Sequence, residues 1–91
     1  MPATVVIIIK LMPESLDVNL QEIQKKAQDL LIPEGAKNIS FQEVPLAFGL
    51  KALNVKMDMP EEKGTDLVEQ KLSSIPGVSS VKIEDYRRAF G

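Results

Sequence analysis

Apolar residues change their spacing several times along the chain, and each change predicts a new element. Residues 3–12 are almost continuously apolar, are rich in Val and Ile, and are followed by Pro13. A strand with both faces covered has this composition, because none of its side chains meets water. We therefore expect a buried strand over residues 3–12, in the centre of its sheet.

The next apolar stripe has the spacing of a helix. Asn19, with Glu22 three residues later, resembles a capping box that opens a helix, and Pro33 lies where that helix has to stop. The apolar stripe consists of Leu20, Ile23, Ala27, Leu30 and Leu31. We expect one amphipathic helix between Asn19 and Pro33.

Two segments in the middle of the chain alternate with period two. Residues 37–44 alternate weakly, with Ile39 and Phe41 on one side, and residues 53–59 alternate cleanly. Such alternation predicts strands with one wet face. Pro45 places the first of them near an edge of the sheet, because proline cannot donate a ladder hydrogen bond.

The last third of the chain predicts a short helix and a fourth strand. Residues 64–66, Gly-Thr-Asp, supply a helix start, and residues 76–77, Pro-Gly, break the helix. Apolar residues then alternate with polar ones over residues 78–85. We expect a strand there and a tail over residues 86–91.

The predicted order is β-α-β-β-α-β in a single domain over residues 1–91. Two split βαβ halves with right-handed crossovers give a ferredoxin-like fold, which is a four-stranded antiparallel sheet with both helices on one face. The other face is then uncovered. We expect it to carry Asn54, Lys56, Asp58, Ser80, Lys82 and Glu84.

Composition excludes several classes of function. The 91 residues contain no cysteine and no histidine, so thiolate chemistry, zinc-thiolate sites and imidazole sites are excluded and enzyme chemistry is disfavoured. A net charge of -2 argues against a nucleic-acid partner, which calls for dense Lys and Arg. No apolar run is long enough for a bilayer, and no signal peptide, metal site or nucleotide-binding motif is evident. We expect a cytoplasmic protein without a cofactor.

One segment does not fit an ordinary hairpin. Residues 44–53 are an apolar run broken by Pro45 and Gly49, and the bend carries Leu46, Ala47 and Phe48 where turns normally carry Asn-Gly or Asp-Gly. Either the bend packs against its own domain, with Phe48 in the core, or it is kept exposed for another protein.

The end of the chain offers a second candidate contact. Tyr86, Arg87, Arg88 and Phe90 combine aromatic and cationic side chains, which are typical interface anchors. The two arginines can equally be a solubilising, frayed terminus.

The same segments carry a resemblance to a known family. The run Val44-Pro45-Leu46-Ala47-Phe48-Gly49-Leu50-Lys51-Ala52-Leu53, followed by Gly64-Thr65-Asp66-Leu67 and the segment at Asp85, resembles the guanine-exchange domain of translation elongation factor 1-beta. The start of the chain over residues 10–15 and the Arg87-Arg88 ending look like the short archaeal form. The resemblance covers essentially the whole chain.

The resemblance implies an exchange factor rather than an enzyme. Such a domain binds elongation factor 1-alpha in its GDP-bound and nucleotide-free forms and speeds the replacement of GDP by GTP, with no cofactor and no membrane. It further implies that the bend touches one domain of the partner and that the C-terminal end approaches the magnesium and phosphate region. The partner-binding residues are then Pro45, Leu46, Phe48, Gly49, Asp85, Arg87, Arg88 and Phe90.

At one position the chain departs from the eukaryotic pattern. Eukaryotic members have a penultimate lysine thought to intrude at the magnesium position, and counting from Asp85 puts Gly91 there. We hypothesise that Arg87 or Arg88 replaces the charge of that lysine, or that Phe90 acts as an apolar wedge.

Two other classes of function remain as alternatives. The first is a ferredoxin-like regulatory domain that dimerises and senses a small molecule. The second is a small phosphatase of similar topology, which is disfavoured because the segment after the first strand, Pro13-Glu14-Ser15, is anionic where a phosphate-binding loop is needed.

Overall fold

Six elements follow one another in the predicted order. The computed structural model describes residues 3–89. Its helices and strands are β1 (Thr4–Pro13), α1 (Leu20–Leu31), β2 (Lys37–Pro45), β3 (Lys51–Pro60), α2 (Gly64–Ser73) and β4 (Val78–Ala89). Short 3-10 turns follow α1 and β2 and precede α2.

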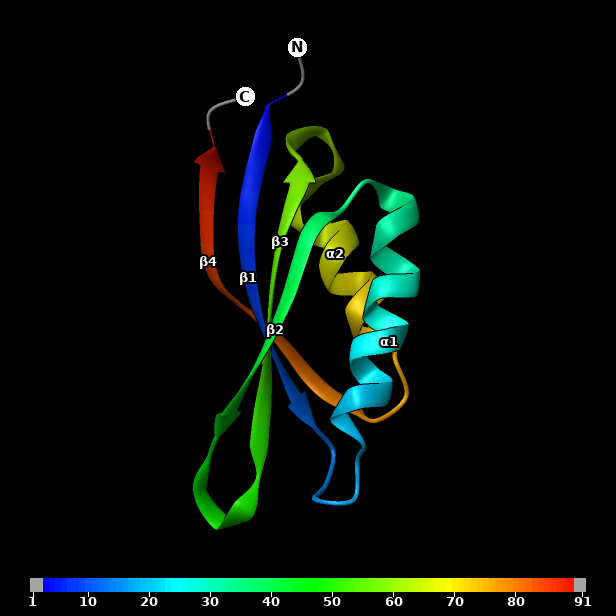
Figure 1. The fold of residues 1–91 in the computed structure, drawn as a ribbon, viewed down its shortest axis with the longest axis vertical. Helices are drawn as coiled ribbons and strands as arrows, with labels where there is room; N and C mark the ends of the chain where they lie inside the picture. The colour runs from blue at the N-terminus through cyan, green and yellow to red at the C-terminus, as the bar shows by residue number, and fades with distance from the viewer. Residues whose placement is uncertain (1–2, 90–91) are drawn as a thin grey trace.

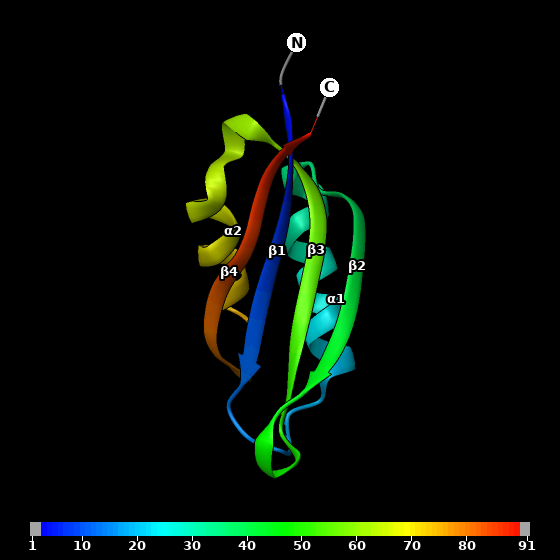
Figure 2. The ribbon, with the colours of Figure 1, turned by 90° about the vertical axis from the view of Figure 1, so that its left-hand side faces the viewer.

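The strands form one antiparallel sheet in the order β2-β3-β1-β4. Both helices cover the same face of this sheet, and the other face is left open (Figures 1 and 2). The prediction of a ferredoxin-like fold is thus confirmed. The central place of β1 and the edge position of β2, which ends at Pro45, are confirmed as well.

The core lies between the sheet and the two helices. Every second residue of β1 points into it, and these residues are at most 2% exposed. Full burial of one such aliphatic side chain contributes roughly 1.5 to 3 kcal/mol to stability. In β1, α1, β3 and α2 the residues that cluster in this core are Val5, Ile7, Ile9 and Leu11 of β1, Ile23, Ala27 and Leu31 of α1, Leu53, Val55, Met57 and Met59 of β3, and Val68 and Leu72 of α2.

The helix starts follow the sequence signals. The side-chain Oδ1 of Asn19 accepts hydrogen bonds from the backbone N–H groups of Gln21 at 2.9 Å and Glu22 at 3.4 Å, so Asn19 caps α1 as predicted. Helix α2 begins at Gly64, also as predicted, although Lys63 at its N-cap position makes no side-chain capping bond.

The predicted tail over residues 86–91 is wrong for its first four residues. Strand β4 continues to Ala89, and Tyr86 pairs with Ile7 of β1. The ladder shifts by one residue on the way, because Ile9 pairs with Ile83 while the preceding Ile8 pairs with Asp85. Glu84 is therefore the extra residue of a β-bulge, and the bulge breaks the period-two pattern by which a strand is recognised.

The open face of the sheet carries the polar residues expected there. Lys56, Ser80, Lys82 and Glu84 are exposed, and Asn54 and Asp58 are half-buried. Half-buried apolar residues of β1 lie among them, namely Val6, Ile8 and Met12, so the expectation that both faces of β1 are covered is wrong. No helix within residues 3–89 is long and apolar enough to cross a membrane.

Candidate functional site

The structure separates the predicted partner-binding residues into two groups. The molecule is elongated, with extents of 45 × 21 × 19 Å. The turn of the β2–β3 hairpin lies at one end of the long axis, and the last residues of β4 lie at the other, beside the start of β1 (Figure 1). Pro45, Leu46, Phe48 and Gly49 are thus together, and they are far from Asp85, Arg87 and Arg88.

The hairpin turn, residues 46–50, is closed by its own backbone. The N–H of Leu46 donates to the carbonyl oxygen of Leu50 at 2.6 Å, and the N–H of Leu50 donates to the carbonyl oxygen of Ala47 at 3.2 Å. Just before the turn, Pro45 pairs with Lys51. Three residues, Ala47 to Gly49, therefore form the tip.

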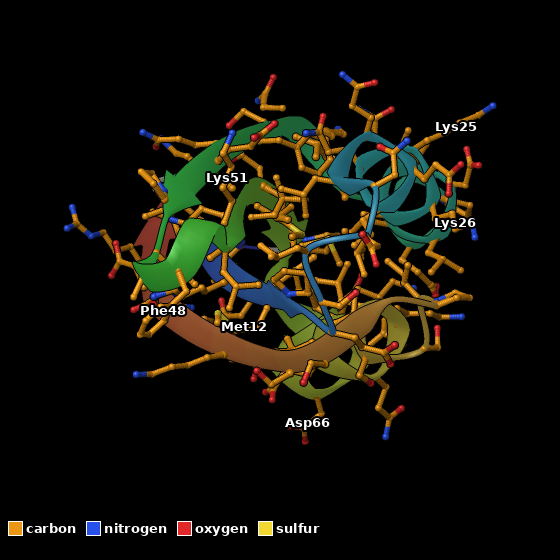
Figure 3. The ribbon with its side chains drawn as sticks, turned by 90° about the horizontal axis from the view of Figure 1, so that it is seen from below. Met12, Lys25, Lys26, Phe48, Lys51 and Asp66 are labelled. Atoms are coloured by element: carbon orange, nitrogen blue, oxygen red, sulfur yellow. The ribbon has the colours of Figure 1, made fainter. Side chains whose placement is uncertain are left out.

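Phe48 is held in the solvent at this tip. Its side chain is 93% exposed, so the alternative that Phe48 belongs to the core is wrong. Its backbone has φ 61° and ψ 29°, and Gly49 follows with φ 79°. A non-glycine residue in this left-handed region costs about 1 kcal/mol or more. Figure 3 views the molecule from this end and labels Phe48 on the turn.

A second exposed apolar side chain, which the sequence reasoning missed, lies beside this turn. Leu16, in the connection from β1 to α1, is 65% exposed. Its Cδ2 lies 3.6 Å from the point where a Cβ on Gly49 would sit, so the two loops are neighbours. A hollow of about 350 Å³ is lined by both loops and includes Leu50 and Lys51. A leucine in an otherwise polar turn is the signal that could have revealed it.

Charged side chains define the opposite end. The Nε of Arg87 lies 2.8 Å from Oδ2 of Asp85, and the Nη2 of Arg88 lies 2.9 Å from Oε2 of Glu61. Asp85 also accepts a hydrogen bond at Oδ1 from the backbone N–H of Tyr86, at 3.0 Å. Each arginine thus has its own carboxylate. The third predicted residue of this end, Phe90, lies outside the described residues.

The bulge decides which of the two successive arginines lies on which face of the sheet. Arg87 pairs with Val6, whose side chain is on the open face, and Arg88 pairs with Val5, whose side chain is in the core on the helix face. Side chains alternate along a strand, so without the extra Glu84 the two arginines would exchange faces.

Taken together, the two ends can make contacts of different chemistry. The hairpin end offers an exposed aromatic ring with Leu16 nearby, which suits an apolar pocket of another protein. The β4 end offers guanidinium groups, which suit carboxylates and phosphates. A partner large enough to reach along the long axis can contact both.

Comparison with known proteins shows the family to which the chain belongs. The chain matches the model of the EF-1 guanine nucleotide exchange domain over residues 6–89, from β1 to the end of β4. Elongation factor 1-beta of Methanothermobacter thermautotrophicus is 47% identical over 85 residues, which cover 92% of this chain and 94% of that protein. Elongation factor 1-beta of Methanocella arvoryzae is 42% identical over 89 residues, which cover 97% of this chain and 99% of that protein.

A third relative, elongation factor 1-beta of Ignicoccus hospitalis, is 41% identical over 86 residues, covering 92% of this chain and 90% of its own. These similarities extend along nearly the full length of both chains, and they favour the exchange factor over the small-molecule sensor and the phosphatase. The chain belongs to the EF-1 guanine nucleotide exchange domain family, and it is a nucleotide exchange factor for elongation factor 1-alpha, not an enzyme.

Proposed function

We propose that this exchange factor holds elongation factor 1-alpha with the hairpin turn and loosens its GDP with the far end of β4. It binds both the GDP-bound and the nucleotide-free partner, and it binds the nucleotide-free partner more tightly. The result is the GTP form of the partner, which carries aminoacyl-tRNA in translation elongation in the cytoplasm. In this proposal Pro45, Leu46 and Gly49 shape the turn that presents Phe48.

The exposure of Phe48 is the observation that carries the proposal. A folded chain gains nothing from an aromatic side chain that is 93% exposed on a backbone with positive φ. A large, rigid ring kept free of its own core is what a protein-binding anchor requires. The family's exchange activity supports elongation factor 1-alpha as the partner of this anchor.

The energy that exchange requires is modest. By linkage, the factor by which GDP weakens binding of the exchange factor equals the factor by which the exchange factor weakens binding of GDP. A hundredfold effect corresponds to about 2.8 kcal/mol of coupling. A few contacts can supply that, and no bond has to be made or broken.

The magnesium and phosphate region of the partner is the most sensitive target for the β4 end. In guanine nucleotide-binding proteins the ion bridges phosphate oxygens and orders the switch loops. A cationic group that competes with the ion for those oxygens weakens the nucleotide. Arg87 and Arg88 are the cationic residues available for this role, whereas Phe90 would act as an apolar wedge and Asp85 would be a further contact residue.

The direct test is release of labelled GDP from purified elongation factor 1-alpha under excess GTP, with and without this protein. We expect release to accelerate in proportion to added protein and then to saturate at micromolar concentrations. The proposal is wrong if release at saturating protein equals spontaneous release.

A further inference from the structure

The two arginines at the end of β4 are held in different ways. Arg88 reaches across the helix face to Glu61, in the turn Glu61–Lys63 that connects β3 to α2. The backbone N–H of Glu61 in turn donates to the carbonyl oxygen of Ala3, at 2.8 Å. Arg88 therefore ties the end of β4 to this turn, and the backbone of Glu61 ties the turn to Ala3.

Arg87 is tied only to a neighbour two residues away. Its Nε contacts Asp85 on the open face, and its side chain is 78% exposed. Within residues 3–89 no second carboxylate lies within ion-pair distance of Arg87. A guanidinium has five N–H donors, so one contact through Nε leaves most of its donors for an external acceptor.

Asp85 is itself fixed in place. Its Oδ1 accepts the N–H of Tyr86 just after the bulge, and its Oδ2 faces Arg87. Both oxygens are thus engaged, one with the backbone and one with the guanidinium. Because residues 85 and 87 share the open face of β4, the carboxylate holds the arginine along the strand and does not cover it.

We propose that Asp85 is a positioning residue that orients Arg87 on the open face to bind an oxyanion of the partner, while Arg88 serves the fold. This inference rests on the proposed exchange function, and it decides between the two arginines that the sequence leaves equivalent. The oxyanion is a carboxylate of elongation factor 1-alpha or a phosphate of its GDP, since a guanidinium matches both.

Preorganisation is the physical reason for the pair. A free arginine loses much rotamer entropy when it binds, and an arginine already held by Asp85 loses less. An exposed ion pair adds little to folding stability, so the contact between Asp85 and Arg87 serves orientation more than stability.

The test measures GDP release against exchange-factor concentration for three variants of the full chain. Arg87→Gln is expected to lower the maximal rate about tenfold, which corresponds to about 1.4 kcal/mol. Asp85→Asn, whose side-chain oxygen can still accept the Tyr86 N–H, is expected to lower it about threefold. Lys82→Gln removes the same charge from the same strand and open face, and it should leave the rate unchanged.

A double variant separates positioning from an independent effect. If Asp85 acts through Arg87, then Asp85→Asn combined with Arg87→Gln is no slower than Arg87→Gln alone. Arg87→Lys should restore part of the rate, because it returns the charge without the planar fork. Multiplicative effects in the double variant, or an Asp85→Asn variant faster than wild type, would overturn the positioning role.

The source of the oxyanion follows from binding measurements with the two forms of the partner. If Arg87 contacts a GDP phosphate only while the nucleotide is being released, Arg87→Gln leaves binding to the nucleotide-free form unchanged. If it contacts a protein carboxylate that becomes accessible when the nucleotide leaves, the variant weakens binding to the nucleotide-free form and leaves binding to the GDP-bound form unchanged. Unchanged binding to both forms, together with an unchanged rate, sinks the inference even though wild-type protein still accelerates exchange. Loss of rate in Arg88→Gln as large as in Arg87→Gln also contradicts it.

Discussion

At the scale of single residues, Phe48 is the residue whose exposure and backbone conformation folding stability explains least. Its ring contributes almost nothing to the core, and its backbone occupies a region that favours glycine. Residues of this kind persist in structures mostly where a binding site requires them. The positive φ of Phe48 leads to a prediction about folding stability that can be tested without a partner.

Phe48→Gly should be more stable than Phe48→Ala by about 1 kcal/mol, because alanine keeps the Cβ that the left-handed region disfavours and glycine does not. Phe48→Ala should itself stay within about 1 kcal/mol of wild type, since no core contact is lost. Urea unfolding of the two variants measures both differences.

Phe41 provides the matched control. It is a half-buried phenylalanine packed against the core, so Phe41→Ala should cost about 2 kcal/mol or more. A loss of that size in Phe48→Ala would mean that the ring packs on the domain in solution. Phe48 would then not be an exposed anchor for the partner.

At the scale of elements, the sequence predicts β1, α1 and β3 well and the end of β4 badly. The first three have uninterrupted patterns, from the apolar run of β1 to the alternation of β3. In β4 the bulge at Glu84 makes Ile83 and Tyr86 successive residues on the helix face, so the spacing is three where a strand pattern requires two. The last four residues of the strand then read as a tail.

The candidate site could also be predicted only in part from the sequence. An apolar tip between two strands is unusual enough to single out Phe48, but an aromatic residue suits a core as well as an interface, so its exposure required the structure. Which of Arg87 and Arg88 lies on the open face depends on the bulge and therefore could not be inferred from the sequence. Leu16 becomes a candidate only when its loop is seen beside Gly49.

The corrected length of β4 changes what truncation should do. Removing residues 87–91 deletes the partners of Thr4, Val5 and Val6 together with the ion pair to Glu61. We expect a loss of about 2 kcal/mol, since each backbone hydrogen bond contributes on the order of 1 kcal/mol. Thermal or urea unfolding of the truncated chain tests this.

A single substitution at the end of β4 is the control for the truncation. Arg87→Gln removes only an exposed ion pair and should change the unfolding free energy by less than about 0.5 kcal/mol. If the truncated chain is as stable as wild type, the end of β4 is not paired with β1 in solution.

At the scale of the whole molecule, the elongated shape fits the proposed division of tasks between the two ends. The hairpin turn and the end of β4 lie at opposite ends of a 45 Å long axis (Figure 1), so in the proposed mechanism they contact different regions of one partner. Sites this far apart, with no shared contacts, should act independently. One end then sets how tightly the partner is held, and the other sets how fast the nucleotide leaves.

The most direct test of this account is the rate of GDP release from elongation factor 1-alpha, measured against the concentration of wild type, Phe48→Ala, Arg87→Gln and the double variant. The account predicts that Phe48→Ala raises the half-saturating concentration about tenfold with little change in maximal rate, corresponding to about 1.4 kcal/mol. It predicts that Arg87→Gln lowers the maximal rate with little change in half-saturation, and that the double variant shows both effects. Contradiction would come from wild-type protein that leaves GDP release at its spontaneous rate, or from two single variants that change the same parameter.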